Sequence, residues 1–348
     1  MRDWTCAPAR TEVQAFHLGL PGYAPTPLTE VPALAAELGV RRMFVKDESA
    51  RMGLPAFKVL GVSWAVHQVL SRRPADGVLT LVTATDGNHG RAVARMSRLF
   101  GQRAHVFVPG GVHPMAVAAI AAEGAQVSEV SGTYDEAVRL AVEAAGQPGT
   151  MLVQDAGWPG YEQIPAWIVE GYSTLFAEVD AQLSEAGVAE PALVVIPAGV
   201  GSLAQAGIIH YRSRPDSSAT ALLTVEPGTA ACVLASLIRG EPAAISTSGT
   251  IMAGLNCGTP SMLAWPYLRD GLDAAVAVAD ADSALAARDL AGYGIPAGPC
   301  GGASLAGARA ALTGEGAQAR RALLAIGPGA TVVLLSTEGS AANPVPPG

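Results

Sequence analysis

The alternation of short hydrophobic runs with amphipathic helical segments constrains the fold of this chain more than any other feature. The runs are rich in Val, Ala and Leu, and most are followed by apolar residues at helical spacing. Continuous apolar strands joined by helices are typical of parallel sheets covered on both faces. We therefore expect an α/β fold with mainly parallel sheets. The expected strands are residues 43–46, 79–83, 105–108, 127–130, 151–154, 192–197, 221–225, 274–279 and 331–336, and the clearest expected helices are 58–70, 89–99, 115–123 and 134–144.

The order of these segments predicts two three-layer α/β lobes. Four strand–helix units between about residues 79 and 155 form one compact set, and the later strands form a second set together with residues 43–46. The smaller lobe is then inserted into the larger one. We expect a small domain at 51–158 and a large domain made of 1–50 and 159–348.

Composition excludes several classes of function. The net charge of −8 argues against a nucleic-acid partner, which favours a basic surface. No apolar run approaches the roughly 18 residues of a membrane span, and the first residues lack the apolar core of a signal peptide, so we expect a cytoplasmic protein without membrane contact. The four cysteines form no C-x-x-C motif, so we expect no metal site.

The stretch "GLPAFKVLG" places Lys58, after Phe57, at the start of a helical pattern. A lysine at this end of a helix meets the positive end of the macrodipole. One interpretation is a surface side chain that extends into solvent. The other is an amine kept neutral by burial and the dipole, which is the form needed for imine chemistry.

The stretch "VTATDGNHGRAV" passes from a strand to a helix through Asp86, Asn88 and His89. The free N–H groups at a helix start can hold a carboxylate or phosphate. Asp86 or Asn88 could instead be a simple helix cap, and His89 could be structural. In α/β sheets ligands bind at the carboxyl ends of strands, where this loop is expected.

The stretch "VVIPAGVGSLAQAG" predicts a third strand–helix loop, at 199–202. Small residues allow backbone N–H groups to surround a phosphate. A tight turn is the simpler alternative. Gly199, Gly201 and Ala204 also fit G-x-G-x-x-A, and Glu226 could bind a ribose, which leaves open a dinucleotide-dependent oxidoreductase. That alternative gives Lys58 no role.

Two further loops follow expected strands. Asp155 follows the strand at 151–154, so its side chain is expected in the cleft. Ser336 and Thr337 end the last strand, where a hydroxyl could face a cofactor or cap a turn.

Taken together, these loops resemble those of fold-type-II pyridoxal-phosphate enzymes. The stretches "FVKDESARMGLPAFKVLG", "ATDGNHGRAVA", "VQDAGWPGYEQIPAWIVEGY", "IMAGLNCGTPS" and "LLSTEG" resemble the diaminopropionate ammonia-lyase family over about residues 43–339. The Asp-Gly before Asn-His-Gly is the most specific of these elements. The resemblance implies the fold-type-II architecture, with the cofactor in the cleft between the lobes, and a homodimer.

The resemblance also implies a role for each cofactor-binding residue. Lys58 would bind pyridoxal 5′-phosphate through its amine, and Asn88 would bond the cofactor's 3′-hydroxyl. A neutral hydroxyl at the pyridine nitrogen would make the ring a milder electron sink, which suits elimination. The other implied cofactor residues are Phe57, the phosphate-binding Gly199, Val200, Gly201 and Ser202, and Ser336 or Thr337 at the pyridine nitrogen.

The implied reaction is α,β-elimination of 2,3-diaminopropionate to pyruvate and ammonia. A carboxylate, Asp86 or Asp155, would favour the ammonium form of the leaving β-amino group. Lys58 and Asp86 could take the α-proton on opposite faces, which would serve L and D enantiomers. The implied substrate-binding residues are Thr85, Asp86, Gly87, His89 and Asp155.

The chain departs from this pattern at residues 298–302. The lyases usually have Glu-Ser-Gly there, whereas this chain reads Gly-Pro-Cys-Gly-Gly. The difference keeps open a lyase or β-replacement enzyme for another β-substituted amino acid, such as serine or threonine. A binding protein without catalytic activity is a further alternative, which the retained Lys58 disfavours. Cys232 and Cys257 match the lyase pattern and could lie together at the mouth of the site.

Overall fold

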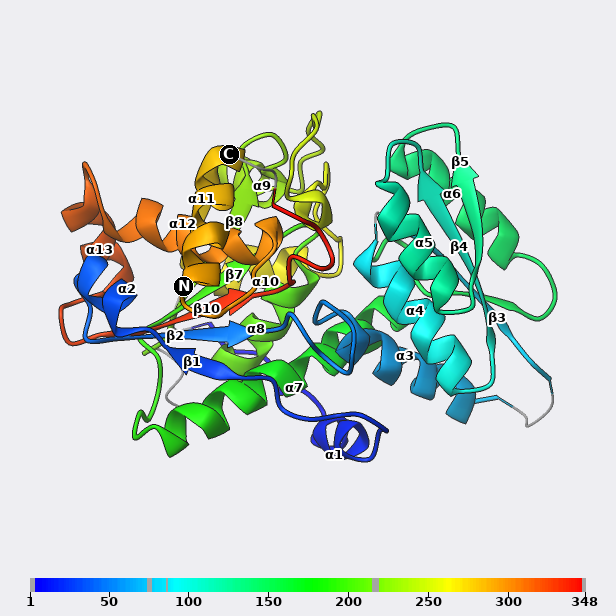
Figure 1. Cartoon of the computed structure of the whole chain (residues 1–348), viewed down its shortest axis with the longest axis horizontal. Helices are drawn as coiled ribbons and strands as arrows, with labels where there is room; N and C mark the ends of the chain where they lie inside the picture. Colours follow the sequence, from blue (N-terminus) through cyan, green and yellow to red (C-terminus); the bar gives the residue numbers. More distant parts are fainter. Residues whose placement is uncertain (1–3, 74–76, 86, 215–218, 346–348) are drawn as a thin grey trace.

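The chain folds into two α/β lobes, each built around one sheet (Figure 1). The computed structural model describes residues 4–73, 77–85, 87–214 and 219–345. The larger sheet has the strand order β1-β2-β10-β7-β8-β9; β1 runs antiparallel to β2, and the other neighbours are parallel. Its strands are β1 (Leu28–Glu30), β2 (Arg42–Asp47), β7 (Leu193–Pro197), β8 (Ala221–Pro227), β9 (Ala274–Val278) and β10 (Thr331–Ser336).

The smaller sheet is entirely parallel, in the order β5-β4-β3-β6. Because neighbouring strands point the same way, the loops that follow them meet at one edge of the sheet. Its strands are β3 (Thr80–Ala84), β4 (Arg103–Pro109), β5 (Gln126–Val130) and β6 (Thr150–Leu152).

Helices cover both faces of each sheet, as the continuous apolar strands predict. On β7, Leu193 and Val195 pack with α2, α11, α12 and α13, whereas Val194 and Ile196 pack with α3, α7 and α8. The helices are α1 (Glu12–Leu18), α2 (Pro32–Glu37), α3 (Val59–Ser71), α4 (Asn88–Leu99), α5 (Pro114–Ala122), α6 (Tyr134–Ala145), α7 (Gln163–Glu185), α8 (Ser202–Arg212), α9 (Cys232–Arg239), α10 (Trp265–Gly271), α11 (Asp280–Gly292), α12 (Pro299–Leu312) and α13 (Ala317–Leu324), with a 3-10 turn η1 (Ala253–Leu255).

The α/β fold with mainly parallel sheets is confirmed, and all nine expected strands are present with shifts of a few residues at their ends. Strand β1 was not expected, because its three residues are too short for a periodic pattern. Strand β6 ends at Leu152, so Asp155 follows it at a distance instead of terminating it. The domain boundaries at 50/51 and 158/159 stay a prediction.

A buried ionic network fixes the segment that leads to Lys58. Arg51 Nη1 lies 2.6 Å from Glu178 Oε1 on α7, and Arg51 Nη2 lies 2.6 Å from Glu48 Oε1. Lys46 Nζ, on β2, lies 2.6 Å from Glu178 Oε2. The four side chains are almost completely buried. Two cations and two carboxylates balance here, so loss of one partner leaves an unpaired buried charge.

We expect Glu178→Ala to lower the free energy of unfolding by about 3–5 kcal/mol, because it leaves Lys46 and Arg51 with too little negative charge. Glu185→Ala is the matched control, since Glu185 is exposed on the same helix; its effect should stay within about 0.5 kcal/mol. Thermal and urea unfolding of both variants measure the difference. Equal effects would show that the network does not hold β2 to α7.

Candidate active site

The centre of the candidate site is an ion pair between Lys58 and Asp155. Lys58 occupies the N-cap position of α3, and its Nζ donates to Asp155 Oδ2 at 2.6 Å. The side chains are only 20% and 10% exposed, respectively. A short charge-assisted hydrogen bond in such a place fixes the position of the amine.

The charge state of Lys58 bears on the two interpretations of its sequence position. Burial lowers the pKa of the Lys58 ammonium, but the carboxylate of Asp155 outweighs burial and leaves that pKa above its ordinary value. Burial likewise raises the pKa of Asp155, and the positive charge of Lys58 reverses this to a value well below the usual range. The structure therefore pairs Lys58 with a carboxylate distant in sequence, which favours its charged form over the neutral amine of the second interpretation.

Lys58 is also the only lysine placed for imine chemistry. The sequence contains two lysines, Lys46 and Lys58. Lys46 is fully buried, and its Nζ donates to Thr26 O, Glu178 Oε2 and Gln182 Oε1. A carbonyl compound in the cleft can therefore meet only one lysine amine.

The loop after β3 is shaped by its own hydroxyl group. Thr85 Oγ1 accepts hydrogen bonds from the N–H groups of Gly87 and Gly90, at 3.0 and 3.2 Å. A Cβ at Gly90 would lie 2.3 Å from Thr85 Cγ2, so this close turn requires glycine. Thr85 thus positions the loop. Asp86 lies outside the described residues.

His89 lies beside Asp155 but uses one nitrogen for structure. Its Nε2 makes a 2.7 Å hydrogen bond to Val153 O, and its Nδ1 lies 3.8 Å from Asp155 Oδ2. Burial lowers the pKa of His89, and the charge of Asp155 offsets this only in part. Burial therefore favours the neutral imidazole, which supports the segment after β6 that carries Asp155.

The end of β10 joins the same cluster. The N–H of Phe57 donates to Thr337 O at 3.4 Å, so the residue before Lys58 contacts the last strand. Among the described residues, the buried hydroxyl oxygens of Ser336 and Thr337 have no hydrogen-bond partner. Buried hydroxyl groups are usually paired, so two unpaired ones at one strand end indicate a place for a polar ligand atom.

The glycine loop after β7, residues 199–201, is the next part of the candidate site. Gly201 has φ +92, and a Cβ there would lie 2.7 Å from Leu268; a Cβ at Gly199 would lie 2.9 Å from Cys257 Sγ. Within the described part of the chain, the N–H groups of Gly199, Val200 and Gly201 donate to no backbone carbonyl. The loop therefore presents unused donors at the start of α8, as an anion site requires.

Ser202 couples this glycine loop to the ion pair. Its hydroxyl donates to the carbonyl oxygen of Asp155 at 2.8 Å, across the two lobes. The hydroxyl proton is therefore not directed at a phosphate, although the backbone of Ser202 remains part of the loop. The thiols of Cys232 and Cys257 both lie against Gly199, so the two residues are near each other.

Glu226, the possible ribose partner in the dinucleotide alternative, is instead bonded to backbone N–H groups of this chain. Its carboxylate accepts hydrogen bonds from the N–H groups of Val233 and Leu234, at 2.7 and 2.8 Å, at the start of α9. The residue is fully buried. The glycine motif therefore lacks the acidic residue of a dinucleotide fingerprint.

Sequence reasoning missed three residues of the site. Gln154 bonds Thr83 Oγ1 and Ala84 O and so ties β3 to the segment that carries Asp155. Tyr172 is a buried phenol close to Lys58. Burial raises its pKa, and the charge of Lys58 opposes this only in part. Glu338 lies in the quoted stretch "LLSTEG", but only the preceding hydroxyls were singled out.

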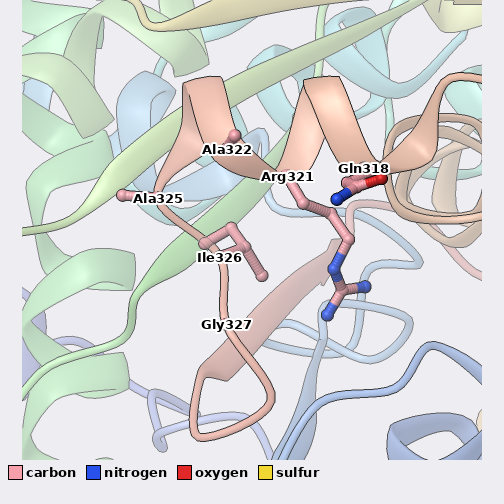
Figure 2. Close-up of a pocket in the computed structure, with 6 residues that line it drawn as sticks. All are labelled: Gln318, Arg321, Ala322, Ala325, Ile326 and Gly327. Atoms are coloured by element: carbon pink, nitrogen blue, oxygen red, sulfur yellow. The ribbon is translucent and has the colours of Figure 1, made fainter.

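A separate surface hollow lies far from this chemistry, at the end of α13 (Figure 2). Its one charged side chain, Arg321, donates to the carbonyl oxygens of Leu38 and Gly39 and so is part of the fold.

Among the residues that the structure describes, no group of three or more His, Cys, Asp or Glu side chains is arranged to hold a metal ion. No helix in the described ranges is long and apolar enough to cross a membrane.

The comparisons with known proteins agree with this geometry. A family model described as pyridoxal-phosphate dependent enzyme matches residues 20–337. The chain belongs to this family of pyridoxal-phosphate-dependent enzymes.

Within this class, the chain groups with the diaminopropionate ammonia-lyases. It is 37% identical to the diaminopropionate ammonia-lyase of Escherichia coli K12 over 93% of this chain and 86% of the relative. The Salmonella typhimurium enzyme is 38% identical over 80% of this chain and 74% of the relative. The E. coli enzyme in complex with D-serine superposes with a TM-score of 0.90 at 34% identity, covering 97% and 92% of the two chains. Its complex with an aminoacrylate–pyridoxal-phosphate intermediate gives 0.87 at 36% identity, covering 94% and 88%.

We expect Glu226→Gln to change how stability depends on pH. Burial raises the pKa of Glu226 to about 7, although the N–H groups of Val233 and Leu234 oppose this. The folded protein then holds a proton that the unfolded chain has lost, so the stability contribution of Glu226 falls as pH rises from about 4.5 to 7. Glutamine has no such proton.

The unfolding temperature of the variant relative to the natural protein should therefore rise by a few degrees between about pH 5 and pH 7.5. Differential scanning calorimetry at both pH values measures it. A constant difference between the two proteins would contradict the shifted pKa.

Proposed function

We propose that this chain catalyses the pyridoxal-phosphate-dependent α,β-elimination of 2,3-diaminopropionate to pyruvate and ammonia. The observation that carries the proposal is the Lys58–Asp155 ion pair, at the centre of a chain 37–38% identical to diaminopropionate ammonia-lyases. The E. coli relative has been solved with D-serine, which supports including D-amino acids among the substrates.

The residues of the site fit the cofactor. An aldehyde needs a primary amine, and Lys58 is the accessible one. A phosphate needs N–H donors. The N–H groups of residues 199–201 donate to no backbone carbonyl of the described residues, so they are available for it. A pyridine nitrogen needs a polar partner, and the unpaired hydroxyl groups of Ser336 and Thr337 are buried nearby.

Pyridoxal phosphate supplies an electron sink for negative charge at the substrate Cα when it is bound. Lys58 would hold it through the amine, and Asn88 would meet its 3′-oxygen. The hydroxyl of Ser336 or Thr337 would meet its ring nitrogen as a neutral group, so no carboxylate strengthens the sink. A milder sink suits a reaction in which the departing group carries electrons away.

The chain's own groups account for the proton transfers. Lys58 removes the proton at Cα in its neutral form, and Asp155 is placed 2.6 Å from its amine to receive or return a proton. While Lys58 carries its charge, that charge holds the pKa of Asp155 well below the usual range and keeps the carboxylate ionised. An ionised carboxylate favours the ammonium form of the β-amino group, which is the form that departs. Asp86 is the candidate for the opposite face of the substrate.

A second candidate function is elimination or replacement on another β-substituted amino acid. The observation that favours it is the segment 298–302 at the start of α12, where the N–H of Cys300 bonds the buried Glu338. We further propose a cytoplasmic homodimer, on the resemblance to the family alone; light scattering on the purified protein tests the assembly.

Borohydride reduction of the holoenzyme should fix the cofactor on Lys58. Reduction converts an imine into a stable amine, so dialysis should no longer remove the cofactor. Peptide mass spectrometry can then distinguish the two lysines of the chain. Label on Lys58 supports the proposal, whereas label confined to Lys46 or to the α-amino group would overturn it.

Two isosteric variants separate the roles of the carboxylates. We expect Asp155→Asn to lower kcat/KM for both enantiomers of diaminopropionate about 10²-fold or more, since the amide cannot exchange a proton with Lys58. Asp86→Asn should affect one enantiomer far more than the other. Pyruvate release measures both. Unchanged turnover of both enantiomers in either variant would remove that carboxylate from the mechanism.

A further inference from the structure

A further hydrogen bond across the two lobes involves Asn88, the residue proposed to bind the cofactor's 3′-oxygen. The side-chain Nδ2 of Asn88 donates to Glu338 Oε2 at 2.6 Å, between residues 250 positions apart. Asn88 is the first residue of α4, which packs on the small sheet, whereas Glu338 follows β10 of the large sheet. The acceptor is a fully buried carboxyl group.

Glu338 is held firmly on its own side of the cleft. Its Oε1 accepts the N–H of Cys300 at 3.2 Å, at the start of α12. Its backbone carbonyl accepts the N–H of Gly298 at 2.9 Å, and its backbone pairs with that of Ala56. The carboxyl group therefore has one oxygen on α12 and the other on Asn88, and it cannot turn without losing both bonds.

We propose that Glu338 is a positioning residue for the cofactor: it orients the Asn88 amide so that the second N–H of that amide faces the cofactor's 3′-oxygen. This inference rests on the proposed function, which assigns Asn88 to that oxygen. An amide nitrogen has two N–H groups in one plane, so a bond from one of them fixes the direction of the other. A bond to a buried carboxyl group that is held at both oxygens fixes that plane more firmly than a bond to mobile water would.

Glu338 also supplies a carboxyl group to the start of α12, which has no acidic residue of its own. Residues 298–302 contain no carboxylate, yet the N–H of Cys300 donates to the carboxyl group of Glu338. The contact places the start of α12, the end of β10 and the start of α4 in one connected set. Cofactor binding through Asn88 thereby depends on the relative position of the two lobes.

The chain offers a closely matched control in Glu226. Both acids are buried, both accept N–H groups at the start of a helix, and both contact a cysteine thiol there. Burial raises the pKa of both carboxyl groups. The bonds that the structure gives Glu226 lie within the larger lobe, so it shares the structural role of Glu338 without the link to Asn88.

The test is the affinity of the cofactor-free protein for pyridoxal phosphate, measured from the visible absorbance of the bound cofactor. We expect Glu338→Gln to weaken binding about tenfold and to shift the absorbance maximum, since an amide has one acceptor oxygen where the carboxyl group has two. Glu226→Gln should stay within about twofold of the natural protein. Glu338→Asp keeps the carboxyl group but withdraws it by one methylene, so it should also weaken binding.

A double-mutant cycle identifies the route of the effect. Asn88→Ala should weaken binding, and adding Glu338→Gln to it should cause no further loss, because the oriented group is already absent. Additive losses would show that Glu338 acts independently of Asn88 and would overturn the inference. So would a loss of affinity in Asn88→Ala alone with none in Glu338→Gln or Glu338→Asp. If Asn88→Ala itself binds normally, the role given to Asn88 in the proposed function fails as well.

Discussion

The ion pair between Lys58 and Asp155 is the interaction on which the rest of the site depends. Two charges that are mostly withdrawn from water are stable only when each is paired. Lys58 stands at the start of α3, and Asp155 follows β6, so their bond fixes two loops at once. The buried network around Arg51 holds the chain before Lys58, and His89 supports the strand end before Asp155.

The parallel topology brings the remaining groups to this pair. Loops after β3, β6, β7 and β10 all leave the carboxyl ends of their strands, so they gather at one edge of each sheet. Hydrogen bonds between the lobes then connect them: Ser202 bonds the carbonyl of Asp155, and Asn88 bonds Glu338. The cofactor site is therefore assembled from both lobes, and its geometry depends on how they are held together.

The fold and the positions of these loops could be predicted from the sequence, because strand and helix periods and turn residues are local signals. The charge states of the site residues could not be predicted from the sequence. Asp155, which raises the pKa of Lys58, lies 97 residues away along the chain. The alternative role of Glu226 stayed open for the same reason: only the structure shows that its carboxyl group binds the start of α9. Glu338 gave no local signal either, because its role depends on a contact with Asn88.

The most direct test of the central claim is pyruvate release by the purified holoenzyme from a panel of amino acids. The panel should contain L- and D-2,3-diaminopropionate, L- and D-serine, and L-threonine, with Lys58→Ala as the blank. The account predicts fast turnover of diaminopropionate, slow turnover of the hydroxy amino acids and none in the variant. If a protein that carries its cofactor releases no pyruvate from diaminopropionate, the assigned substrate is wrong. The residues at 298–302, at the start of α12, would then be the first to examine for a different specificity.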